Sequence, residues 1–148
     1  EEEDIGLVHQ QAQQLQPAVE QARQRSEDAL AQLATQQQLL ARAEHQLSEL
    51  QRYRQEYAAA GDGAQSVAAL LNRQQFVERI DRAIVQQEAE VARQNRQLAQ
   101  VRDHWRRAHA RESALDSVVA QHREEERRAA DRHEQAEVDE RMQYRRPR

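Results

Sequence analysis

Apolar positions recur at alternating spacings of three and four residues along two long segments of this chain. The first segment runs from residue 15 to residue 57 and the second from residue 77 to residue 119. This alternation is the a/d pattern of a coiled coil, whose seam faces a partner helix. With a few polar residues among them, the seam positions are Leu15, Val19, Ala22, Ser26, Ala29, Leu33, Gln36, Leu40, Ala43, Leu47, Leu50, Arg54 and Tyr57, then Val77, Ile80, Ile84, Gln87, Val91, Gln94, Leu98, Val101, Trp105, Ala108, Glu112, Leu115 and Val119.

One strong helix break separates the two segments. Glycine stands on both sides of Asp62, and this pattern ends helices and forms turns. We therefore expect a turn near residues 60–65. Because proline suits the first turn of a helix and not its interior, Pro17 predicts a first helix from near Gln16 to near Ala59. Ser66 and Asn72 are alternative N-caps for a second helix that reaches about Tyr144.

The predicted fold class is all-α: two long helices in an antiparallel coiled-coil hairpin, the second helix being longer. A short connection makes consecutive helices antiparallel neighbours, so folding about Asp62 pairs residue 47 with residue 77, 33 with 91 and 17 with about 109. The second helix would then overhang the first by about 30 residues, where its seam fades after Val119, and this overhang would be the least stable region. We expect a single domain over residues 14–147, with residues 1–13 as an N-terminal extension or leftover tag.

Composition agrees with helices and excludes several other classes. The chain has three glycines, two prolines and no cysteine, so β-sandwiches and disulfide scaffolds are ruled out. No stretch approaches about 20 apolar residues, so we expect no direct membrane insertion. Apart from four acidic residues at positions 1–4, acidic and basic residues balance. A nucleic-acid-binding chain normally has a basic excess, so we expect no nucleic acid partner.

Candidate chemistry is sparse. The six histidines include no pair at the three- or four-residue spacing of a helical metal site, and His122 and His133 fall on the fading seam as packing residues. Carboxylates such as those at positions 124–126 neighbour arginines on what reads as a solvated face. A two-helix hairpin also offers no concave pocket to desolvate a base. We therefore expect no enzyme, no cofactor and no metal.

The five aromatic residues carry more information. Tyr53, Tyr57 and Phe76 gather near the predicted turn, where exposed aromatics would indicate a binding hot spot. Packing that closes the end of the coiled coil explains the same placement, and spacing alone does not decide between the two. Trp105 lies on the seam, where core packing is the favoured interpretation.

Several motifs together resemble one known family. Residues 46–57 resemble its QLxxLxxYxxEY stretch, and residues 72–76 resemble its N-Y-Q-x-F element, although Arg73 replaces the aromatic residue. Trp105-Arg106 resembles a recurrent tryptophan followed by a basic residue. Leu15-Gln16-Pro17 is similar to the opening L-x-P, and residues 139–146 are similar to the closing D-E-x-x-x-R-R. From about residue 14 to residue 147, the chain thus resembles the FliJ family of flagellar type III export proteins.

This resemblance implies a coiled-coil hairpin similar to the stalk of a rotary-ATPase gamma subunit. It implies three partners: the hexameric flagellar export ATPase, whose pore receives the terminal part of the hairpin, the cytoplasmic domain of the export-gate membrane protein, and the substrate-specific export chaperones. The implied location is cytoplasmic, peripheral to the inner membrane at the base of the flagellum. The competing interpretation is a generic structural tether or spacer with no export role, and composition does not separate the two.

The resemblance also implies a site for the export gate, near the turn. By match to the family, the residues that contact the gate are Gln46, Leu50, Tyr53, Tyr57, Phe76, Ile80, Ala83 and Gln87. We call these eight residues the tip face. Leu50, Tyr57, Ile80 and Gln87 are also seam positions, so packing and binding are entangled at these four.

Overall fold

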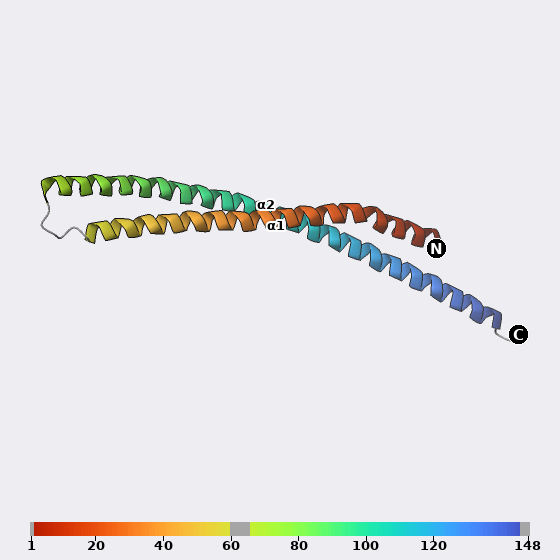
Figure 1. Cartoon of the computed structure of the whole chain (residues 1–148). Helices are drawn as coiled ribbons and strands as arrows, with labels where there is room; N and C mark the ends of the chain where they lie inside the picture. Colours follow the sequence, from red (N-terminus) through yellow and green to blue (C-terminus); the bar gives the residue numbers. More distant parts are fainter. Residues whose placement is uncertain (1, 60–65, 146–148) are drawn as a thin grey trace. The chain divides into compact units, whose positions relative to one another are not determined.

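The computed structural model describes residues 2–59 and 66–145, and these residues form two helices. Helix α1 spans Glu2–Ala59 and helix α2 spans Val67–Arg145, with no strand within the described ranges. The two helices run antiparallel and pack against each other, and α2 is the longer (Figure 1). The predicted fold class is therefore confirmed. The turn expected at 60–65 lies outside the described residues.

The contacts divide the chain into two compact units, each built from both helices. The tip unit is Ala29–Trp105, and the terminal unit is Glu1–Asp28 with Arg106–Arg148. The division of the sequence at residue 13 into an extension and a domain stays a prediction.

The start of α1 corrects the sequence-based expectation. The helix begins at Glu2 rather than near Gln16, and it continues through Pro17. Proline removes one backbone hydrogen bond from a helix interior, which normally favours a break. Here Leu15 and Val19 are half-buried on either side of Pro17, and Ala22 is buried. Burial of these seam positions offsets the local penalty, because tertiary packing stabilises helices more than intrinsic propensity does.

Ser66 is the N-cap of α2, which settles one alternative left open by the sequence. The Ser66 Oγ accepts a hydrogen bond from the backbone N–H of Ala69 at 3.2 Å, and the Ser66 carbonyl accepts one from Leu70 at 3.1 Å. A side-chain bond to the third helical N–H is the geometry expected of a capping serine. Asn72 lies inside α2 and caps nothing.

The predicted seam is the buried face of both helices. In the tip unit the buried residues are Ala29, Leu33, Gln36, Ala43, Ile80, Gln94 and Leu98. In the terminal unit they are Ala22, Ser26, Val119 and Ala129. All eleven positions follow the three-and-four spacing of the predicted seam or its continuation. In each unit the core is thus a narrow row of facing seam side chains that includes alanines, with Gln36 and Gln94 as the buried polar residues of the tip unit and Ser26 as that of the terminal unit.

The register between the helices differs from the expected one by one heptad. In the tip unit, Gln36 contacts Gln94 and Gln87 contacts Ala43, and this register pairs Leu47 with Ile84 and Leu33 with Leu98. The expected partners, Val77 and Val91, each lie seven residues nearer the start of α2. The expectation was wrong because it folded the chain symmetrically about Asp62. In the structure, the first turns of α2 extend past the last turn of α1 (Figure 1).

The terminal unit corrects the expected overhang. His9 Nδ1 lies 2.8 Å from the Glu126 Oε1 atom, whereas pairing Pro17 with His109 would have placed His9 near residue 117. Val119 and Ala129 are buried, so the seam continues well past the point where it was expected to lose its partner. The reasons are the different register, which brings Val119 level with about residue 16, and the extra length of α1 before Pro17. Every residue from 134 to 145 of α2 is exposed, whereas buried or half-buried positions recur along α2 before residue 134.

Candidate functional site

The structure brings all eight residues of the tip face together within the tip unit. Four lie on α1 and four on α2, at spacings of three and four that keep each set on one side of its helix. The rings of Tyr57 and Phe76 stack, and Gln46 accepts a hydrogen bond from Gln87. Because α1 and α2 run antiparallel, the same register places Tyr53 at the level of Ile80, and Leu50 at the level of Ala83. The tip face is therefore a continuous strip across both helices.

Polar and aromatic contacts hold the two ends of this strip. The ring centroids of Tyr57 and Phe76 are 4.4 Å apart, with an interplanar angle of 27°. At the other end, Gln87 Nε2 donates to the Ala43 carbonyl at 2.9 Å and to Gln46 Oε1 at 3.1 Å. These contacts join the two helices in the observed register and position the side chains at both ends of the strip.

An ion pair between the helices lies beside the strip. The Arg54 guanidinium donates to the Asp81 carboxylate, which raises the pKa of Arg54 above its ordinary value. Arg54 was predicted as a seam position but is exposed, so its charge stays in water while its stem lies on the seam.

The residues of the tip face differ in how far they are exposed to solvent. The Tyr53 side chain is about half exposed, at 52%, and Tyr57 and Phe76 stay 36% and 39% exposed despite their stacking. Ile80 is only 7% exposed and belongs to the seam. The stack supports the packing interpretation for Tyr57 and Phe76, while a binding role for the three aromatics stays a prediction.

A shallow groove runs along the strip. It has a volume of about 340 Å³ and is lined by Gln46, Glu49, Leu50, Tyr53 and Gln87. Glu49 was missed by the sequence analysis, although its spacing to Arg52 was a visible signal: Arg52 donates to it at 2.6 Å, one turn along α1. The groove therefore offers an aromatic ring, an apolar floor and a carboxylate side by side.

A second groove lies at the start of α2. It is lined by Tyr57, Ala69, Asn72, Arg73 and Phe76. The Tyr57–Phe76 stack forms part of its wall, so this groove continues the tip face toward the N-terminus of α2.

A buried amide pair lies further along the tip unit, and the sequence did not reveal it as a pair. Gln36 Nε2 donates to Gln94 Oε1 at 2.6 Å, with the two residues 6% and 9% exposed. Gln94 in turn donates to Glu90 at 2.9 Å, and Arg93 binds the same carboxylate through two nitrogens. The hydrogen bonds from Arg93 and Gln94 lower the pKa of Glu90 to about 2.

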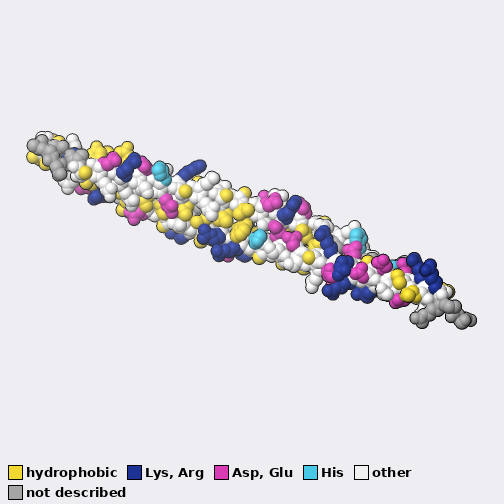
Figure 2. Space-filling model, turned by 90° about the horizontal axis from the view of Figure 1, so that it is seen from below, with side chains coloured by type: hydrophobic (Ala, Val, Ile, Leu, Met, Phe, Trp, Pro, Cys, Tyr) yellow, Lys and Arg dark blue, Asp and Glu magenta, His cyan; other side chains and the backbone are white. Residues whose placement is uncertain are grey.

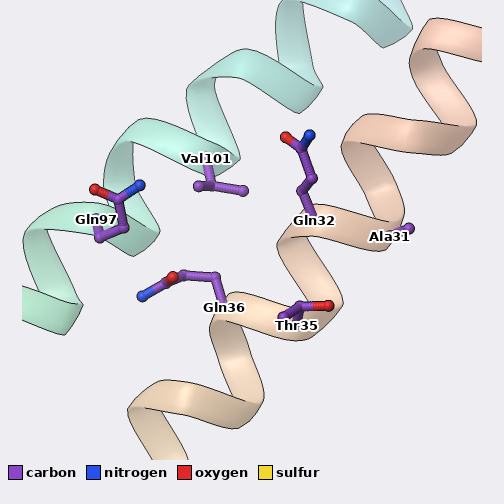
Figure 3. A pocket seen from close by; sticks show the side chains of 6 residues that line it. All are labelled: Ala31, Gln32, Thr35, Gln36, Gln97 and Val101. Carbon is purple, nitrogen blue, oxygen red and sulfur yellow. The ribbon is translucent and has the colours of Figure 1, made fainter.

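An open surface hollow of about 390 Å³ adjoins this pair, lined by Ala31, Gln32, Thr35, Gln36, Gln97 and Val101 (Figure 3). In this view the Gln36 side chain extends from α1 toward α2.

Charge and metal chemistry give no second site. On the face seen in Figure 2, arginine and carboxylate side chains are interspersed along the chain. Within the described residues, no group of three or more His, Asp or Glu side chains could hold a metal ion.

Trp105 is half-buried, as its seam position predicted, and His122 and His133 are half-buried as well. None of the described helices is long and apolar enough to span a bilayer.

Comparison with known proteins identifies the family. The model of the family described as flagellar FliJ protein matches residues 10–148, nearly the whole chain. Neither the curated proteins nor the solved structures gave a match. The matched range includes the tip face, the amide layer and the half-buried tryptophan. The chain therefore belongs to the FliJ family of flagellar export proteins.

Proposed function

We propose that this protein is a non-enzymatic coiled-coil stalk of the flagellar type III export apparatus. It binds the hexameric export ATPase with its terminal unit and the cytoplasmic domain of the export-gate membrane protein with its tip face. It also handles the substrate-specific export chaperones. It acts in the cytoplasm, at the inner-membrane base of the flagellum. The observation that carries this proposal is the assembled, accessible tip face in a chain of the FliJ family.

The tip face has the properties of a protein-binding surface. Tyr53 projects from beside the seam with half its surface exposed, so it is not needed to close the coiled coil. Tyrosine is enriched at binding hot spots because a large ring with a polar tip buries well at little entropic cost. The groove beside Tyr53 supplies the surrounding contacts, with Leu50 as its apolar floor and Glu49 at its edge.

The terminal unit offers a different surface for the ATPase. Val138, Met142 and Tyr144 are exposed on the last turns of α2, at 41%, 62% and 85%. Two or more turns earlier on α2, ion pairs such as Arg127 with Glu124 and Asp131 balance charge within the helix. A surface of this kind suits a partner that surrounds the helix without one dominant charge contact.

The test compares two tyrosines on the two units. We expect Tyr53→Ala to weaken binding of the purified gate domain by about 30-fold, which corresponds to a hot spot of about 2 kcal/mol. Tyr144→Ala is the matched control, because it removes the same side chain from the terminal unit and should leave gate binding unchanged. Binding constants come from calorimetry, and circular dichroism follows the melting transition of each variant.

The outcomes distinguish the alternatives. Tyr53→Ala should leave ATPase binding and the melting temperature nearly unchanged, since the ring is half exposed. If gate binding survives Tyr53→Ala, the tip face is not the gate site. If the unaltered protein binds neither the gate domain nor the ATPase, the chain is a structural tether and the proposed function is wrong.

A further inference from the structure

The seam of α2 carries two glutamines one heptad apart, whereas the facing seam of α1 carries one. In the structure Gln36 pairs with Gln94, and Gln87 bonds instead to the Ala43 carbonyl and to Gln46. If α2 moves by seven residues along α1, Gln87 takes the place of Gln94 opposite Gln36. A heptad repeat keeps every seam position on the seam after such a movement. The buried amide of Gln36 therefore has a partner in both registers.

A second feature of the tip unit matches the same movement. The first turns of α2 extend past the end of α1 (Figure 1), and Val67, Leu70 and Leu71 are 74%, 49% and 53% exposed. Counting the seam spacing back from Val77 reaches Leu70, a seam position that no described residue of α1 faces. Among the described residues, this segment of α2 without a facing layer is about one heptad long. In the alternative register Leu70 lies level with Arg54, so the last turns of α1 cover the exposed start of α2.

Two apolar layers keep an aliphatic pair after the movement. Leu47 exchanges Ile84 for Val77, and Leu33 exchanges Leu98 for Val91. Each exchange replaces one aliphatic side chain with another, and such swaps change packing energies only modestly.

We propose that the tip unit is a two-register switch, in which α2 slides by one heptad along α1 between the Gln36–Gln94 pairing and a Gln36–Gln87 pairing. The movement is about 10 Å at 1.5 Å per residue. It breaks the Tyr57–Phe76 stack, the Arg54–Asp81 ion pair and the Gln46–Gln87 bond. The register thus decides whether the tip face is assembled.

Spin labels measure the register directly, because the chain has no cysteine of its own. Labels at Glu44→Cys and Arg102→Cys stand at exposed positions on α1 and α2. Their separation along the helices is about 22 Å in the observed register and about 33 Å in the alternative one. Gln94→Leu removes the amide partner of the observed register, so we expect the main distance to lengthen by about 10 Å. Gln87→Leu is the matched control: it removes the alternative partner and should keep the shorter distance.

A charge reversal provides an independent perturbation on the surface, where folding is not at risk. Asp81→Arg places two arginines opposite each other in the observed register, so it should also favour the longer distance. Adding Arg54→Asp restores an opposite-charge pair and should restore the shorter distance. The two-register proposal is overturned if both Gln94→Leu and Asp81→Arg keep the distance of the unaltered protein. It is also overturned if Gln87→Leu lengthens the distance as much as Gln94→Leu does.

Discussion

The buried amide pair leads to a prediction in which two substitutions are less harmful than one. Gln36→Leu removes the donor that satisfies Gln94 Oε1, 2.6 Å away, and leaves that oxygen in a layer that is less than a tenth exposed. An unsatisfied buried polar group costs about 1–3 kcal/mol. The new leucine recovers part of this through apolar burial. We therefore expect Gln36→Leu to lower the free energy of unfolding by about 1–2 kcal/mol.

The double variant Gln36→Leu/Gln94→Leu replaces the pair by an apolar layer. Replacing both partners of a buried hydrogen bond with apolar groups is nearly neutral or stabilising, so we expect most of the loss to be recovered. Urea unfolding followed by circular dichroism measures both free energies. In thermal melts the melting temperature of the single variant should fall by about 2–8 °C, at roughly 2–4 °C per kcal/mol for a chain of this size.

Gln37→Leu is the matched control, because Gln37 is exposed beside Gln36 on the same helix. Its effect should stay within about 0.5 kcal/mol. The reasoning is refuted if the double variant loses as much stability as the two single variants added together. That result would mean that the two amides contribute separately and not as a pair.

Two further predictions concern charge and burial in the tip unit. Hydrogen bonds from Arg93 and Gln94 hold the pKa of Glu90 at about 2 in the folded protein, against an ordinary value of 4.5. The ionised Glu90 carboxylate therefore contributes to stability above pH 4.5, and this contribution is lost as the pH falls toward 2. The melting temperature should therefore fall less steeply over this range in Glu90→Gln than in the unaltered protein, and equal slopes would contradict the assignment. Leu33 is only 8% exposed, so Leu33→Ala should lower the free energy of unfolding, measured in urea, by about 2–3 kcal/mol. Leu30 is 51% exposed on the same helix, so Leu30→Ala should change this free energy by less than about 0.5 kcal/mol. Equal losses would show that Leu30 is also packed.

The seam could be predicted from the sequence because burial along a helix follows a short local period. Positions such as Leu33, Ala43 and Leu98 are buried where the three-and-four spacing placed them. The same period limits what the sequence determines. Heptads look alike after a shift of seven residues, so the pattern does not say that Leu47 faces Ile84 and not Val77.

Pro17 shows a different limit of sequence reasoning. Its local preference predicts a helix start, but packing of the seam on either side carries α1 on to Glu2. The tip face was located through family motifs, and the seam spacing already predicted the burial of Ile80 and the exposure of Tyr53, which lies off the seam. The structure added that Glu49 joins the groove. The lining of a groove depends on the facing helix, which no single segment encodes.

The single-file seam has a consequence for how this protein tolerates sequence change. The tip unit consists of two helices, so its buried residues follow one another in layers along the seam, and Leu33 and Ile80 lie at separate levels. Each layer therefore has only its facing layer and its immediate neighbours to pack against. Contributions from layers more than about 10 Å apart should therefore be thermodynamically independent. Substitutions can therefore accumulate one layer at a time. A second substitution in the facing position of the other helix restores the packing that the first one disturbed. A globular core of the same size links all its members, and so permits far fewer such paired exchanges.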